Sequence, residues 1–282
     1  MIKCIHRIKP FTKEPGTEML LPGTLDVVRV FPTHVEKGDE RIDFGIDGPI
    51  KRFMAMADLE RNEIVVSGET SKGSYRNLLK GTEVNELPRL HLGCHKAQDW
   101  LLIQRRGDIR EFLPFWYRLG KNLPETVKAG AIEPKNRLEA EKWLIEQFRI
   151  RFGGLGLPRN SDEAHYGFPF QDKGLEWLKG SSDWIEKLFI YEKENELFIL
   201  PCLPPQLHAG RLIGVQLTDL RVDMEWTKKQ IRRITLYPLR DGELTLIVNP
   251  FFKTCRINGA RALINQSIKF NANVKVNIDC FY

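Results

Sequence analysis

The stretch from Glu196 to Val248 constrains the fold more than any other part of the chain. It contains five short runs of β-type residues cut by proline, glycine and charged residues, namely Leu197–Leu200, Leu212–Leu217, Leu220–Trp226, Ile231–Leu236 and Leu244–Val248. In the third run Val222, Met224 and Trp226 alternate with charged residues, which is the period of a strand that buries one face. Short strands at this spacing predict an antiparallel, sandwich-like β domain in which Trp226 is buried.

The first 92 residues have a similar β-type composition. Runs rich in Val, Ile, Phe and Met occur at Val27–Phe31, Arg41–Ile46, Lys51–Leu59 and Glu63–Ser67. The segment DLERNEIVV is typical of a hairpin, with Glu60, Arg61 and Asn62 in its turn. We predict an N-terminal β-sandwich-like domain over residues 1–92.

The pattern changes from strand-like to helical near Leu92. Residues 98–106 have a helical composition, and Gly107-Asp108 supplies a break and an N-cap before the next helical stripe. Capping-box patterns at Asn136 and Asp183 predict the starts of two further helices. Residues 121–135 have the composition of a surface connector.

These patterns together place the chain in the α+β class. A short helical segment at 93–195 follows the N-terminal β domain, and a C-terminal antiparallel β-sandwich-like domain covers 196–282. The tail after Phe252 could add two more strands, the last at Val274–Ile278.

Two segments of the chain resemble family 95-type glycoside hydrolases, the α-L-fucosidase group. The order ILPCLPP, a strand that starts with glycine, VDMEW, a lysine-rich turn and IRRITL is similar to the C-terminal β-domain of that family. Upstream, HYGFPFQDKG (His165–Gly174) resembles the family's His-Pro-Phe-Gln-Asp-Gly segment at the end of a catalytic helical barrel. The resemblance covers residues 165–250, and the β–α–β order of the whole chain agrees with it.

The resemblance implies a site around residues 165–177. Asp172 matches the family's catalytic-base aspartate, shifted by one residue, while the asparagine that follows the motif's glycine is replaced by Leu175. His165 and Gln171 would contact the sugar. Trp177 follows the same loop outside any clear helical stripe, and we expect it to stack on a sugar ring.

The helical segment is too short to reproduce the whole barrel. A twelve-helix barrel needs roughly 190–200 residues, and the interval from Leu92 to Asn195 supplies far fewer. No general acid can be matched to accompany Asp172. We therefore expect a glycoside hydrolase-like protein that binds carbohydrate with little or no hydrolysis; a non-enzymatic scaffold protein is the alternative.

Two other groups of charged or polar residues have a structural and a functional interpretation. Asp223 and Glu225 lie two residues apart on one strand, near the separation of a glycosidase pair, but we expect them to form the solvated face opposite Trp226. The cluster HLGCHKAQD (His91–Asp99) superficially resembles a metal site. It lacks a second ligand pair, so no metal is expected.

Composition excludes several classes of protein. The net charge of +6 permits an anionic partner without requiring one. The basic doublets Arg105-Arg106, Lys228-Lys229 and Arg232-Arg233 are too far apart to favour nucleic acid. The sequence GGLG at 153–156 follows a helical pattern rather than a strand, so we expect no cofactor. The five scattered cysteines favour a reducing, cytoplasmic location, and no run of apolar residues is long enough to predict a membrane span.

Overall fold

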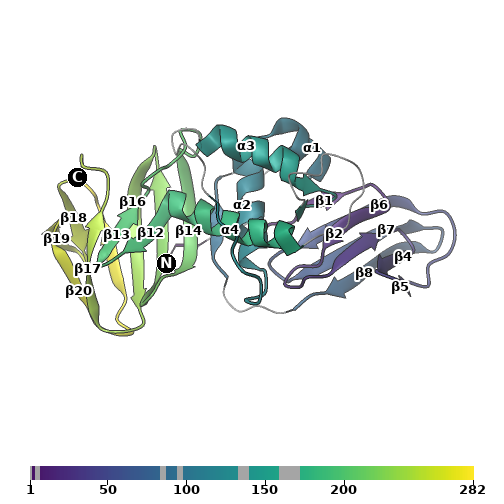
Figure 1. The fold of residues 1–282 in the computed structure, drawn as a ribbon, viewed down its shortest axis with the longest axis horizontal. Helices are drawn as coiled ribbons and strands as arrows, with labels where there is room; N and C mark the ends of the chain where they lie inside the picture. The colour runs from purple at the N-terminus through teal and green to yellow at the C-terminus, as the bar shows by residue number, and fades with distance from the viewer. Residues whose placement is uncertain (1, 4–6, 83–86, 94–97, 133–139, 159–171) are drawn as a thin grey trace.

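The computed structural model describes residues 2–3, 7–82, 87–93, 98–132, 140–158 and 172–282. It is elongated, with β-sheets at both ends and a layer of helices between them (Figure 1). The predicted α+β class with sandwich-like β regions is confirmed.

The N-terminal β region consists of two four-stranded antiparallel sheets, ordered β1-β6-β7-β8 and β2-β3-β4-β5. Their strands are β1 (Phe11–Thr12), β2 (Thr17–Leu20), β3 (Val27–Val30), β4 (His34–Lys37), β5 (Glu40–Asp43), β6 (Lys51–Asp58), β7 (Glu63–Thr70) and β8 (Gly73–Lys80). The predicted β6–β7 hairpin is confirmed, and Asn62 in its turn has a φ of 51°. Asparagine tolerates this left-handed conformation better than most residues.

Four helices lie between the sheets in the described part of the chain. They are α1 (Trp100–Arg106), α2 (Ile109–Lys121), α3 (Ala140–Arg151) and α4 (Asp172–Phe189). The predicted N-cap of α2 is confirmed, because the Asp108 carboxylate accepts a hydrogen bond from the Arg110 amide at 3.0 Å. The cap predicted at Asn136 lies outside the described residues.

The predicted helix start at Asp183 is wrong, because α4 runs through this position without a break. The small residues that precede Asp183 instead allow α4 to pack closely against its neighbours. A Cβ atom on Gly180 would lie 2.0 Å from the carbonyl oxygen of Gly130, and a Cβ on Gly120 would lie 2.5 Å from the Cβ atom of Ser182. Glycine therefore lets α4 approach α2 and the following segment closely.

That segment is not the plain surface connector expected from its composition. Leu123 and Val127 are buried, and the Gly130 amide donates to the Glu176 carbonyl at 2.8 Å. This segment therefore has buried positions and contacts α4 at Gly130; residues 133–135 lie outside the described residues.

The C-terminal β region contains two sheets, ordered β12-β13-β17-β20 and β19-β18-β21-β16-β15-β14-β9. Their strands are β9 (Arg89–His91), β12 (Ile190–Lys193), β13 (Glu196–Ile199), β14 (Ala209–Gln216), β15 (Leu220–Thr227), β16 (Gln230–Pro238), β17 (Gly242–Ile247), β18 (Thr254–Ile257), β19 (Ala260–Leu263), β20 (Ser267–Phe270) and β21 (Val276–Asp279). A small hairpin of β10 (Phe152–Gly153) and β11 (Leu157–Pro158) follows α3. All described pairs are antiparallel except β13–β17.

Two strands of this region come from outside the predicted C-terminal span. β9 lies within residues 1–92 but pairs with β14, and β12 lies within 93–195 but pairs with β13. The C-terminal sandwich thus draws strands from both sides of the helical segment.

The inner face of β15 is the one predicted from alternation. Val222, Met224 and Trp226 are at most 1% exposed. The indole of Trp226 donates to the Leu207 carbonyl at 2.9 Å, and its ring lies 5.3 Å from that of Phe189 at the end of α4. Trp226 therefore joins the helical layer to the core of the C-terminal sandwich.

Candidate functional site

Of the residues predicted to form the sugar site, only Trp177 has a side chain in the described part of the structure. His165 and Gln171 lie outside the described residues, as does the side chain of Asp172 at the start of α4. Trp177 lies on α4 with 6% of its surface exposed, 5.0 Å from the Trp116 ring and 5.7 Å from the Phe152 ring. A ring packed in this aromatic core offers no open face to a sugar.

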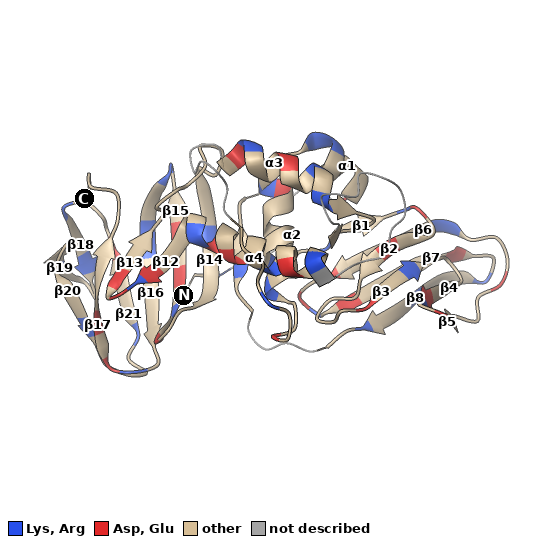
Figure 2. Cartoon of the chain, viewed as in Figure 1, with Lys and Arg blue, Asp and Glu red and all other residues tan. Residues whose placement is uncertain are grey.

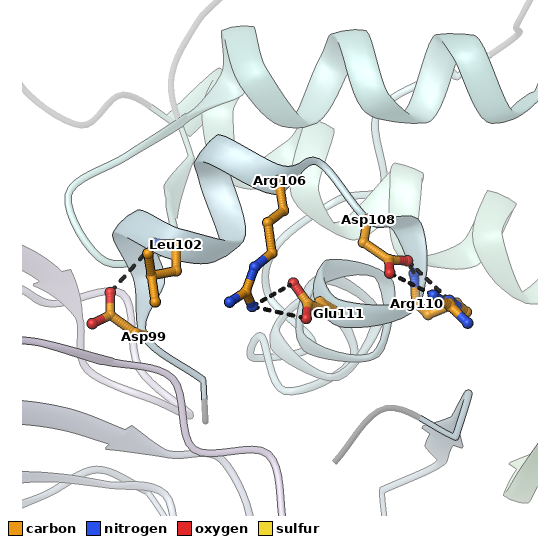
Figure 3. Close-up of polar contacts among 6 residues, drawn as sticks. All are labelled: Asp99, Leu102, Arg106, Asp108, Arg110 and Glu111. Carbon is orange, nitrogen blue, oxygen red and sulfur yellow. Dashed lines mark hydrogen bonds and ion pairs between the residues drawn. The ribbon is translucent and has the colours of Figure 1, made fainter. Parts of the chain in front are cut away.

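The described members of the His91–Asp99 cluster have structural roles. Asp99 caps α1 by accepting a hydrogen bond from the Leu102 amide at 3.3 Å (Figure 3). Cys94 and His95 lie outside the described residues. Where the chain is described, no three His, Cys, Asp or Glu side chains gather as metal ligands would.

The acidic side chains between α1 and α2 are likewise engaged by neighbouring groups. Glu111 pairs with Arg106 at 3.1 Å, and Asp108 pairs with Arg110 at 2.7 Å (Figure 3). This corner therefore stabilises the two helix ends and offers no pair of carboxylates for acid–base chemistry.

The outer face of the seven-stranded sheet carries a group of paired charged side chains. Glu225 on β15 lies between two arginines, with 3.1 Å to Arg211 on β14 and 2.9 Å to Arg233 on β16. Further along the same sheet, Arg256 pairs with Asp279 at 3.1 Å. The strand register lines these charges up across the face, so that Glu225 and Asp279 each meet an arginine.

The ion pairs keep Glu225 ionised. Burial alone would raise its pKa, but hydrogen bonds from Arg233 and Arg211 outweigh burial and hold the pKa below the ordinary value of 4.5. A carboxylate held in this way is a poor proton donor at neutral pH, so Glu225 does not fit the role of a general acid.

Asp223 is not solvated, contrary to the expectation from alternation. It is 7% exposed, and its carboxylate accepts hydrogen bonds from the Gly214 amide at 2.8 Å and from the Tyr237 hydroxyl at 3.1 Å. Gly214 has a φ of 71° and lies in a β-bulge, where β14 shifts register between Leu212 and Val215. The bulge turns a backbone amide toward Asp223, and Asp223 in turn orients the Tyr237 ring.

Tyr237 lies in a depression of about 420 Å³ at one end of this face. The depression is lined by Gln216, Arg221, Tyr237, Pro238, Leu239, Asn273 and Lys275. The Arg221 guanidinium lies over the Tyr237 ring at 4.6 Å from its centroid, and the Lys275 ammonium lies 5.8 Å away. Burial raises the pKa of Tyr237, and the Asp223 charge and hydrogen bond raise it further, so the phenol stays protonated.

Sequence reasoning missed this group of residues because its members are distant along the chain. The pairing of Arg221 with Tyr237, and of Leu236 with Val276, sets Lys275 beside Tyr237. Alternation places Arg221 on the outer face, but the β16–β21 register depends on tertiary packing and leaves no local signal.

The chain matches no protein-family model and no curated protein. The similarity to family 95-type glycoside hydrolases therefore rests on the quoted motifs alone. No helix among the described residues has both the length and the apolar character needed to cross a membrane.

Proposed function

We propose that this protein binds carbohydrate and hydrolyses it little or not at all, and that the depression around Tyr237 is the binding site. One observation carries the proposal: a single depression combines an aromatic ring, two amide side chains and an exposed lysine. Sugar sites need an apolar surface for the ring carbons and fixed hydrogen-bond donors and acceptors for the hydroxyls.

The same geometry favours binding over hydrolysis. Cleaving a glycosidic bond needs a proton donor and a base or nucleophile held on opposite sides of the bond. The Asp223 carboxylate, which contacts the Tyr237 hydroxyl, accepts two hydrogen bonds, and Glu225 is paired with two arginines. Neither is placed to activate water above Tyr237.

The family resemblance implies a second candidate site, at which hydrolysis would take place. If the chain hydrolyses fucosides, Asp172 acts as the base, with His165 and Gln171 against the sugar. This site would lie at the start of α4, on a different element from the depression, so separate variants can test the two sites.

Binding of the full chain to an array of immobilised neutral and acidic glycans tests the proposal. We expect Tyr237→Ala to weaken binding by at least about tenfold, because it removes both the apolar ring and the surface on which Arg221 packs. Tyr282→Ala is the matched control, since Tyr282 is 72% exposed and does not line the depression. If wild-type protein binds no glycan, the carbohydrate proposal is wrong and the scaffold alternative stands.

A further inference from the structure

We infer that one end of the C-terminal sandwich docks onto an anionic lipid bilayer. The surface is formed by β18 with the turn before it, by β19 and by the residues that follow β21. Its side chains, which we call the apolar–basic tip, are Phe251, Lys253, Arg261, Leu263 and Tyr282. None of them lines the depression around Tyr237, so this inference is independent of the proposed function.

The apolar side chains of the tip are unusually exposed to solvent. Phe251 is 85% exposed, Tyr282 is 72% exposed and Leu263 is 54% exposed. These are the three largest exposed fractions of large apolar side chains in the described part of the chain. Single exposed apolar residues are common on proteins, whereas a group of them marks an interaction site.

Strand pairing gathers these side chains at one place. Thr254 lies opposite Leu263 in the β18–β19 pair, and its backbone exchanges two hydrogen bonds with Tyr282, at 3.1 and 2.9 Å. Directly opposite residues of an antiparallel pair project to the same face, so Leu263 and Tyr282 flank Thr254 on one face. The Lys253 amide donates to the Tyr282 carbonyl at 2.6 Å, so the turn with Phe251 begins at this row.

The segment that carries most of the tip is basic and has no acidic residue. Residues 244–278 contain neither Asp nor Glu, and their five cationic residues are Lys253, Arg256, Arg261, Lys269 and Lys275. Figure 2 shows Asp and Glu on the helical layer and on the N-terminal sheets, so this stretch differs from the rest of the chain. A basic segment of this kind favours an anionic partner.

The positive charge of the tip is not balanced by its neighbours. Asp279 pairs with Arg256 at 3.1 Å, while Arg261 lies directly opposite Arg256 and adds a second positive charge. Lys253 and Arg261 are both exposed, and neither forms an ion pair with another described residue. An anionic surface would therefore relieve the repulsion between the two arginines.

The tip is placed where a flat surface can reach it. β19 is the edge strand of its sheet, and β18, β19 and the C-terminus lie at one end of the elongated molecule (Figure 1). Apolar side chains there can enter the headgroup region of a bilayer while the adjacent cations contact anionic lipids. Stable attachment to a membrane surface commonly needs these two signals together.

The kinds of side chain favour a bilayer over a single-stranded nucleic acid. Bases stack on aromatic rings along a positive groove. Leu263 has no ring on which a base could stack, yet it is one of the most exposed apolar side chains. Lipid acyl chains accept aliphatic and aromatic side chains alike, so a bilayer accounts for all three.

Co-sedimentation with lipid vesicles tests the inference. One set of vesicles consists of phosphatidylcholine alone, and the other contains phosphatidylserine as about a third of its lipid, which adds negative charge. We expect the full chain to partition onto the phosphatidylserine vesicles at least about tenfold more strongly. Raising the salt concentration should weaken this partition.

Variants separate the two contributions. Phe251→Ala should weaken the partition about tenfold by removing an inserted ring. Leu101→Ala is its control, because Leu101 is 46% exposed and lies on α1.

Lys253→Gln with Arg261→Gln should weaken the partition at least about tenfold by removing two cations. Lys51→Gln with Lys72→Gln is the matched control, because both lysines are exposed and lie in the N-terminal β region. Thermal melting of each variant checks that the fold is retained.

Each other outcome overturns a defined statement. No partition onto phosphatidylserine vesicles at low salt overturns the inference and leaves the proposed function standing. Equal partition onto both kinds of vesicle overturns the anionic class, and unchanged partition of both tip variants overturns the location. A dimer in analytical ultracentrifugation that Phe251→Ala dissociates assigns the tip to a second copy of the chain instead. Tighter binding of a single-stranded oligonucleotide, lost in the same variants, overturns the choice of a bilayer.

Discussion

Arg118 offers the sharpest test of how the three layers are joined. It projects from α2 with 7% of its side chain exposed. Its guanidinium donates to the carbonyls of Leu87 at 2.6 Å, Pro88 at 3.2 Å and Leu59 at 3.3 Å. One side chain therefore ties the helical layer to the β6–β7 hairpin and to the segment that leads into β9.

Replacing Arg118 by Met should destabilise the protein by about 3–4 kcal/mol. Removing one partner of a buried ionic group costs roughly 3–5 kcal/mol, and each buried carbonyl left without a donor costs about 1–3 kcal/mol. We expect a loss of stability toward the lower end of this range, because Glu60 does not lose its only partner. Glu60 lies 3.7 Å from Arg118 and also pairs with Arg89 at 3.2 Å, and this second ion pair remains in the variant. Burial lowers the pKa of Arg118 although the Glu60 charge opposes this shift, which indicates that the guanidinium is substantially desolvated.

Urea unfolding followed by circular dichroism measures the effect. Arg29→Met is the control, because Arg29 is 52% exposed and pairs with Glu18 only at the surface, where such pairs contribute about 0–1 kcal/mol. Arg118→Lys should recover little, since an ammonium lacks the planar fork that reaches three carbonyls. If Arg118→Met unfolds within about 0.5 kcal/mol of wild type, Arg118 does not join the layers as described.

Three further predictions concern Trp226, Glu225 and hydrolytic activity. Trp226→Ala should cost about 3–5 kcal/mol, because it opens a cavity and leaves the Leu207 carbonyl without its donor; an unchanged thermal midpoint would contradict this. Glu225 has a lowered pKa, so its stabilisation is present above its ordinary pKa of 4.5 and is lost as the pH falls through the lowered value. The stability gap between wild type and Glu225→Gln should therefore narrow in thermal melts from pH 6 to pH 3, and a gap that widens would refute the assignment. Purified protein should release little or no product from aryl α-L-fucosides, and steady turnover abolished by Asp172→Ala would show that hydrolysis occurs after all.

Strands with a clear alternation were predictable from the sequence. The run around Val222 and Trp226 shows one buried and one polar face, because a half-buried strand imposes a two-residue period. The outer face of the same strand was harder to predict. Asp223 has the alternation of a solvated residue, yet a bulge in another strand and a hydroxyl from a third enclose it.

Helix boundaries and distant pairings were harder to predict. The stretch around Gly180 and Asp183 has the composition of a helix start, but the small residues there allow α4 to cross α2 closely. The sequence of β9 gives no local signal that it pairs with β14, because β14 lies far along the chain. Strand pairings of this kind bring together the residues that line the depression around Tyr237. The sequence alone therefore could not predict which residues line it.

A crystal structure of the full chain with a glycan that it binds on the array would test the central proposal most directly. We predict that the sugar occupies the depression, with a ring face against Tyr237 and hydroxyl groups near Gln216 and Asn273. A glycan seated instead against residues 165–177, with the depression around Tyr237 empty, would contradict the proposed site and favour the one implied by the glycoside hydrolase resemblance.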